Sequence, residues 1–335
     1  IMDTPFSGAQ HGVAVYAYNN TGGPYAIAMT NVLLDDFQKN GTALLGEGLT
    51  VALDNVTALG QGPTGVTAQN GIQVGYGAAG DVDNCTVSGV AYTGADWTAT
   101  GFLVYGPGTV DADNMDIDGC QTSVYYIDAG GTCNRFEVTD PLSDPLYVYT
   151  TAAKKGGEAR PPAASPIDAA GAASAQKSAV VFNLTNSTFT GSDAANSWGP
   201  TAWAGDAIAF NLAGCAISHF DVGVGVYEDG ATVTGTARGN DFVDNLSYGL
   251  WSNSAADYDA IGNWWGDATG PLHPTLNPAG LGNEVSDHVL FDPWSGLVGA
   301  EPASLDPLPC GATRDITVHY DAAANAPGFK GYSVL

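Results

Sequence analysis

The chain has 335 residues, of which 44% are hydrophobic and 13% are charged, and its formal net charge at pH 7 is −26. A surface of this sign repels nucleic acid and anionic lipid, so we expect neither as a partner. No stretch of about 18 apolar residues occurs, so no membrane-spanning helix is expected.

A short phrase recurs along the chain, consisting of a small or polar pair, an inward residue, an outward residue and a large apolar residue. The first copy contains Asn31-Val32-Leu33-Leu34 and the fifth is aligned as Cys133-Asn134-Arg135-Phe136. The second residues of these tetrads are Val32, Val56, Cys85, Met115, Asn134, Ser187, Cys215, Asn240 and Asn263. Their spacing of roughly 20 to 30 residues is the length of one solenoid coil. The longer interval from Asn134 to Ser187 corresponds either to two coils or to one coil with an insertion.

Stretches of alternating polarity lie between these markers, for example residues 71–76 and 123–127. Alternation with a period of two places one face inward and the other outward. The Asn at each bend is expected to hydrogen-bond its counterpart in the next coil. The pattern predicts an all-β fold, a right-handed parallel β-helix of roughly ten coils with a short C-terminal β extension. A β-sandwich is disfavoured because its hairpin turns recur every 8–12 residues or so.

Residues 152–178 interrupt the repeat and are rich in Ala, Pro, Gly and Ser. They predict a long loop inserted between coils. The segment also holds four of the nine basic residues: Lys154, Lys155, Arg160 and Lys177. It is interpreted either as a solvated insertion or as a flap that contacts a neighbouring molecule.

Residues 262–298 are expected to form a terminal cap, so that the β-helix spans residues 1–298. The open end of a solenoid exposes apolar core and unpaired strand edges, and a cap must cover both. The aromatic side chains available for this task are Trp264, Trp265 and Trp294.

The same segment resembles the terminal element of secreted bacterial right-handed parallel β-helix repeat proteins, which are pectate-lyase-like solenoids. The resemblance is carried by residues 262–271, 277–282 and 285–294, and less strongly by residues 68–74. It implies the fold and a secreted location. It leaves the activity open, because such proteins include lyases, hydrolases, epimerases, adhesins and surface proteins without known activity.

The C-terminal region has a different character. Residues 299–311 are interpreted as a Pro-rich linker. Residues 312–335 are interpreted as strands of an incomplete immunoglobulin-like or cohesin-like domain, or as a tail that completes a neighbouring subunit by strand exchange.

Five cysteines occur without any C-x-x-C spacing, so a zinc site is not expected. Cys120 and Cys133 are close in sequence and could form a disulfide in an oxidising compartment.

Catalytic motifs are not found. A lyase requires a base and a cation that neutralises the uronate carboxylate, and the coils contain few basic residues. His219 and Asp221 could form a His–Asp unit, although no nucleophile motif accompanies them. Catalysis therefore stays an open question, and the sequence favours a protein without it.

Acidic residues suggest one metal site. Asp54, Asp83 and Asp113 occupy the same repeat position in successive coils, and Asp116 follows in the densest acidic run. Stacked carboxylates repel one another, and a hard cation would relieve this repulsion. We therefore predict Ca²⁺ at these four residues, with a solvated acidic face as the alternative.

Aromatic residues near the coil turns suggest a second kind of site. Trp198 and Trp203, in the company of Trp97 and Trp251, could stack on sugar rings or could pack a loop.

The sequence favours an extracellular or cell-surface structural or adhesive module that self-assembles into filaments or arrays, with itself or neighbouring surface proteins as partners. Two alternatives stay open. One is a carbohydrate-active enzyme for a neutral or cationic glycan, which requires a lateral groove with two carboxylates about 5 to 10 Å apart. The other is a Ca²⁺-dependent glycan-binding module.

Overall fold

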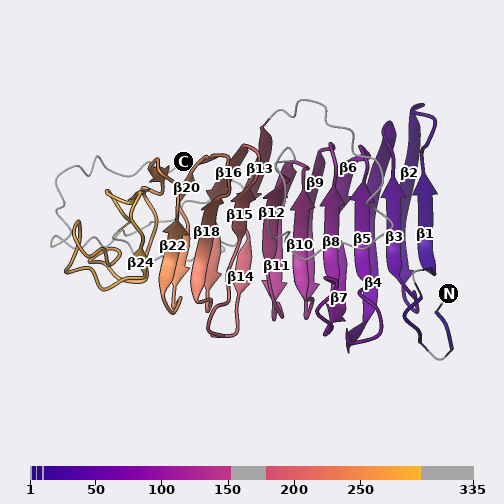
Figure 1. The fold of residues 1–335 in the computed structure, drawn as a ribbon, viewed down its shortest axis with the longest axis horizontal. Coiled ribbons are helices and arrows are strands. Elements are labelled where there is room, and N and C mark those ends of the chain that lie inside the picture. Colours follow the sequence, from indigo (N-terminus) through magenta and orange to yellow (C-terminus); the bar gives the residue numbers. More distant parts are fainter. Residues whose placement is uncertain (1, 5, 10, 152–178, 296–335) are drawn as a thin grey trace, which may run out of the picture.

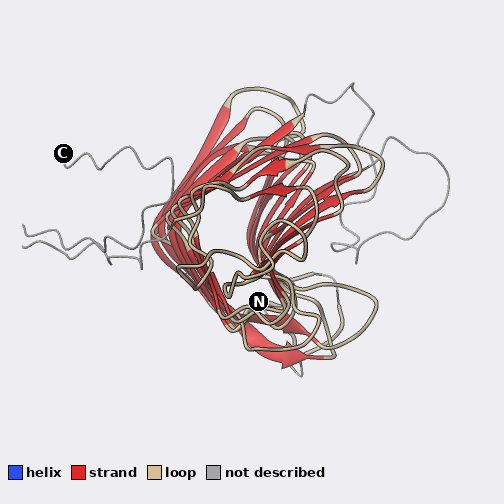
Figure 2. Cartoon of the chain, turned by 90° about the vertical axis from the view of Figure 1, so that its left-hand side faces the viewer, coloured by secondary structure: helices blue, strands red, loops and turns tan. Residues whose placement is uncertain are grey.

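A computed structural model describes residues 2–4, 6–9, 11–151 and 179–295. Within these ranges the chain forms strands and turns but no helix, and hence no helix long and apolar enough to cross a membrane. The strands stack in parallel as a β-solenoid of about nine turns, seen from the side in Figure 1 and along the stack in Figure 2. The predicted parallel β-helix is confirmed, with about nine coils where roughly ten were expected.

Several expectations fall outside the described residues. They concern the inserted loop at 152–178, the last residues of the cap at 296–298, the linker at 299–311 and the β extension at 312–335.

A ten-stranded parallel sheet forms one wall of the solenoid. In spatial order its strands are β1 (Val13–Tyr18), β3 (Asn40–Leu45), β5 (Asn70–Gly75), β8 (Thr100–Tyr105), β10 (Thr122–Ile127), β12 (Leu146–Thr150), β15 (Thr201–Ala204), β18 (Val222–Glu228), β22 (Tyr248–Ser252) and β24 (Glu284–Val285).

A thirteen-stranded sheet forms the remaining walls, and its longest strands run through a bend. Its strands are β2 (Tyr25–Leu34), β4 (Leu49–Thr64), β6 (Ala79–Asp83), β7 (Thr86–Tyr92), β9 (Val110–Asp118), β11 (Gly131–Thr139), β13 (Val180–Thr185), β14 (Thr188–Thr190), β16 (Ile208–Ala213), β17 (Ala216–Ser218), β19 (Val233–Thr234), β20 (Ala237–Arg238) and β21 (Asp241–Val243). A two-stranded sheet pairs β23 (Tyr258–Asp259) with β25 (Val289–Leu290).

The bend in each coil is made by a residue in the left-handed conformation. Asn and Gly adopt this conformation at little cost, which explains their recurrence at the start of the tetrad. The amide of Asn55 donates to the Asn31 side chain at 2.6 Å, and that of Asn114 donates to Asn84 at 2.8 Å. The expected hydrogen bonds between stacked Asn side chains are therefore present. Positive φ angles occur at Asn31, Asn55, Asn84, Asn114, Arg135, Asn186, Gly214, Gly239 and Gly262.

The alignment of the fifth phrase was wrong by two residues. Phe136, rather than Asn134, lies in register with Met115, and Arg135 is the bend residue with a φ of 55°. The bend residue of the other coils is Asn or Gly, whereas Arg135 occupies the bend here and its guanidinium contacts Asp113. The sequence pattern does not reveal this contact. The misalignment also affected the side-chain assignments: Asn134, expected to point inward, lies in register with Asp113 and is only partly buried, whereas Cys133, placed at the bend, is buried in the core.

The interval that follows is one coil with an insertion. Strand β11 pairs directly with β14, with Glu137 opposite Thr188. The residues between these two strands therefore add length to a single coil.

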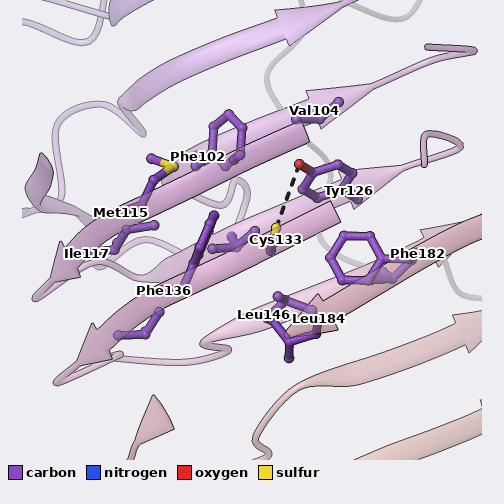
Figure 3. Close-up of a cluster of buried hydrophobic side chains, with 14 of the residues drawn as sticks. Phe102, Val104, Met115, Ile117, Tyr126, Cys133, Phe136, Leu146, Phe182 and Leu184 are labelled. Atoms are coloured by element: carbon purple, nitrogen blue, oxygen red, sulfur yellow. Dashed lines mark hydrogen bonds between the residues drawn. The ribbon is translucent and has the colours of Figure 1, made fainter. Parts of the chain in front are cut away.

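The core runs along the inside of the solenoid as columns of apolar side chains (Figure 3). Phe102, Tyr126 and Phe182 stack edge to face, with ring centroids 5.9 and 4.8 Å apart. The Tyr126 hydroxyl donates to the Val110 carbonyl at 2.9 Å, so its polar end is satisfied inside the core. Burial in this manner supplies most of the folding free energy of a repeat protein.

The disulfide that Cys120 and Cys133 could form is not present. Both thiols are free and buried: Cys133 contacts the Tyr126 hydroxyl, whereas Cys120 contacts the carbonyl of Asp118, two residues earlier in the same coil. Burial raises the pKa of the Cys120 thiol to about 12 and also raises the pKa of the Cys133 thiol. Both thiols therefore pack in the core as small apolar side chains.

Residues from 262 to 295 pack against the last coil. Trp265 is fully buried and stacks on Phe242 with ring centroids 4.6 Å apart, and β24 extends the ten-stranded sheet beyond β22.

Candidate functional site

A cleft of about 730 Å³ lies on the outer face of the ten-stranded sheet, toward its C-terminal half. Its floor is formed by residues of β10, β12, β15, β18 and β22. In each strand the intervening residues, such as Val148 and Ala202, point into the core. The period-two alternation of a strand thus places a second set of side chains on the outside of the solenoid.

Parallel register gathers aromatic residues from coils that are distant in sequence. Tyr125 lies opposite Tyr147, and Trp203 lies opposite Tyr227. Tyr147 and Trp203 belong to adjacent strands although the inserted residues separate them in the chain, and their ring centroids are 6.4 Å apart. The insertion therefore leaves the outer face continuous.

A connected aromatic surface is formed by four rings: Trp198, Trp203, Tyr227 and Trp251. The centroids of Trp203 and Tyr227 are 4.0 Å apart, with ring planes inclined by 27°. Tyr227 and Trp251 stack at 6.0 Å, and Trp198 meets Trp251 edge to face at 5.4 Å. All four are only partly buried, so each presents ring surface to the cleft.

Trp198 reaches the cleft from the loop that precedes β15, and Gly225 provides the space for it. A Cβ atom added at Gly225 would lie 2.7 Å from the Trp198 ring and 2.8 Å from the Thr201 hydroxyl. The absence of a side chain at this one outward position lets the indole lie over β18.

Two carboxylates line the cleft at the ends of strands. Asp144 precedes β12 and accepts a hydrogen bond from the Ser143 hydroxyl at 2.9 Å. Burial raises the pKa of Asp144. Asp221 precedes β18 and accepts from the Asn196 backbone N–H at 2.7 Å and from the Ser247 hydroxyl.

The electrostatic character of the cleft is negative. Among the described residues, its lining includes Asp144 and Asp221 but no Lys, Arg or His. At its margin the Trp203 indole N–H donates to Asp229 at 3.1 Å. Threonine and serine hydroxyls from Thr98, Thr122, Thr201 and Ser247 supply neutral hydrogen-bonding groups.

Trp198 and Trp203, which the sequence proposed as glycan-stacking residues, both line this cleft. Trp251 lines it as well, whereas Trp97 packs against the core. The sequence analysis did not identify Tyr147 or Tyr227 as site residues. Their outward position in alternating strands was a detectable signal, but their convergence depends on the register of separate coils.

The predicted metal ligands are only partly brought together. Asp54, Asp83 and Asp113 lie in register on β4, β6 and β9, as the repeat indicated. Asp116 lies beyond the bend, in register with Thr86, and does not join this row. Among the described residues, no group of three or more His, Cys, Asp or Glu side chains is arranged to hold a metal ion.

Two carboxylates of the row already have side-chain partners within the protein. The Asn84 amide donates to Asp54 at 2.8 Å, and the Arg135 guanidinium contacts both oxygens of Asp113. Ca²⁺ binding here stays a prediction.

The suggested His219–Asp221 unit does not form. His219 contacts Asp193 instead, with Nδ1 and the carboxylate oxygen 3.1 Å apart. Asp221 instead accepts hydrogen bonds from the Asn196 backbone N–H and from the Ser247 hydroxyl.

In comparisons with protein-family models, with curated proteins and with solved structures, nothing matches this chain.

Proposed function

We propose that the protein is an extracellular adhesive β-helix module that binds an extended carbohydrate chain in the cleft formed by Trp198, Trp203, Tyr227 and Trp251. The observation that carries this proposal is the connected surface of partly exposed aromatic rings over several coils. Pyranose rings have apolar C–H faces and hydroxyl edges. Aromatic faces bordered by hydroxyl and carboxylate groups complement both features.

The charge of the cleft indicates the class of glycan. Asp144 and Asp221 would repel a polyuronate, and the part of the lining that the structure describes has no basic side chain to neutralise one. A neutral or amino-bearing glycan is therefore the proposed ligand.

An extracellular location is supported by the resemblance of residues 262–294 to secreted bacterial solenoids. Assembly through the C-terminal strand concerns residues outside the described ranges and stays a prediction.

The test compares Trp203→Ala with Tyr18→Ala by titration calorimetry against soluble xylan, mannan, β-glucan and chitosan oligosaccharides. Tyr18 is 54% exposed and lies on the same outward face, at the other end of the sheet, so it is a matched control. We expect Trp203→Ala to weaken binding about 30-fold, which corresponds to roughly 2 kcal/mol for a central aromatic contact. Tyr18→Ala should bind like the wild type.

The proposal fails if the wild type binds none of these glycans, or if the two variants bind equally well. Repeating the wild-type titration with a chelator tests the Ca²⁺-dependent alternative. That alternative predicts a loss of affinity although every aromatic residue of the cleft is still present.

A further inference from the structure

We propose that Asp144 and Asp221 act as a hydrolytic pair that cleaves a neutral glycan bound in the aromatic cleft. This inference rests on the proposed carbohydrate binding and adds a reaction to it. Its basis is the position of two differently held carboxylates on the wall of a cleft whose floor is aromatic.

The spacing of the pair follows from the stack. Asp144 leads into β12 and Asp221 leads into β18, and β15 is the one strand between them. Two steps at the strand spacing of a parallel sheet amount to about 10 Å. This backbone spacing is slightly larger than the roughly 6.5–9.5 Å between the carboxyl groups of an inverting glycosidase, which leaves room for a water molecule. In register, Asp144 lies level with Val222, the residue after Asp221.

The surroundings of the two carboxyl groups assign their roles. Asp144 has one side-chain hydrogen-bond donor, Ser143, and its burial disfavours the charged form, so it suits a general acid. Asp221 accepts from the Asn196 N–H and the Ser247 hydroxyl, contacts that fix the orientation of its carboxylate, and it takes the role of general base.

The reaction is a single displacement. Asp144 donates its proton to the glycosidic oxygen as the bond between that oxygen and the anomeric carbon breaks. Water attacks the anomeric carbon from the opposite side and transfers a proton to Asp221. The products are two shorter chains, and the new reducing end has inverted configuration. The two carboxyl groups return to their starting states by proton exchange with solvent.

The experiment measures reducing ends released from whichever xylan, mannan, β-glucan or chitosan oligosaccharide the wild type binds, and proton NMR identifies the first anomer formed. Asp144→Asn preserves the shape of the side chain. We expect it to lower the rate at least about 100-fold while affinity changes little. An aryl glycoside, whose leaving group needs no proton, should lose less. Glu137→Gln, on the exposed face of β11, should match the wild type.

Each outcome is decisive. Binding by the wild type without release of reducing ends overturns the hydrolytic pair but leaves the proposed function intact. Absence of binding removes both. Cleavage by Asp144→Asn at the wild-type rate, or a retained anomeric configuration, also overturns the assignment. Asp221→Asn is a supporting variant only if it still binds the glycan, because Asp221 also anchors the loop that carries Trp198.

Discussion

Asp83 lies between Asp54 and Asp113 at the strand spacing of a parallel sheet, about 4.8 Å, and beside Asp81 on its own strand. Burial and the neighbouring carboxylates together raise the pKa of Asp83 above its ordinary value of 3.8. The folded protein therefore binds this proton more tightly than the unfolded chain does. The contribution of Asp83 to stability is present below pH 3.8 and is lost as pH rises through the raised pKa.

Asp83→Asn should accordingly raise the free energy of unfolding at pH 7 in low salt. The gain is expected to be less than about 1 kcal/mol, because these carboxylates are partly solvated. Urea denaturation across a pH series should also show a shallower loss of stability above pH 3.8, and added salt should shrink the difference.

Glu137→Gln provides the control for removal of one exposed negative charge. A lower stability of Asp83→Asn at pH 7 would contradict this interpretation of the row. Stabilisation of the wild type by Ca²⁺ that disappears in Asp83→Asn would instead support the predicted metal site.

At the scale of single elements, the bend before each marker residue determines how one strand leads into the next. The coil turns sharply at a residue with positive φ, and the first coils use Asn whereas Gly214, Gly239 and Gly262 serve in later ones. Glycine supplies the conformation alone. Asparagine also joins adjacent coils through its amide, as Asn84 does to Asp54.

Two substitutions at Asn84 should separate these contributions. Asn84→Ala loses the hydrogen bonds and places a Cβ-bearing residue in the left-handed region, so we expect a loss of about 1–3 kcal/mol. Asn84→Gly loses the hydrogen bonds but keeps the conformation, and should cost about 1 kcal/mol or less. Urea midpoints of the two variants test this ranking, and equal losses would show that the amide contacts dominate.

At the scale of the whole molecule, stability is distributed along the stack because each coil contacts only its neighbours. The last coil is covered by Trp265, which stacks on Phe242. Local unfolding at this end would expose the core beneath β22 first and beneath β18 next. Strands β3 and β5 lie many coils away (Figure 1).

Trp265→Ala should therefore cost about 3–5 kcal/mol locally, as expected for removal of a buried aromatic side chain. Hydrogen exchange should accelerate in β18 and β22 before it changes in β3 and β5. Leu276→Ala, at a residue of the same region that is 72% exposed, is the control. Uniform acceleration along the stack would contradict this account and indicate a fully cooperative solenoid.

The repeat could be predicted because its cause is local. A bend needs a residue that tolerates positive φ, and a wall needs alternating polarity, so both leave a pattern in the chain. The one misaligned phrase, at Arg135, shows the limit of this reasoning: an Arg can occupy the same conformation when Asp113 in the neighbouring coil holds its side chain.

The site was harder to predict for a related reason. Trp198 and Trp203 were recognisable as aromatic residues near turns, but Asp144 and Tyr147 precede the insertion and Asp221 and Tyr227 follow it. Their membership in one cleft depends on β12 pairing directly with β15.

By itself, the sequence determined the solenoid architecture, the inward and outward assignment of residues outside the fifth phrase, and the stacking of Asp54, Asp83 and Asp113. These features depend on the alternation of side chains and on backbone preferences, which act over a few residues. The tertiary structure decided the pairing of coils across the insertion, the free state of Cys120 and Cys133, and the aromatic cleft. Such features arise from contacts between coils, and these depend on register along the stack rather than on distance along the chain.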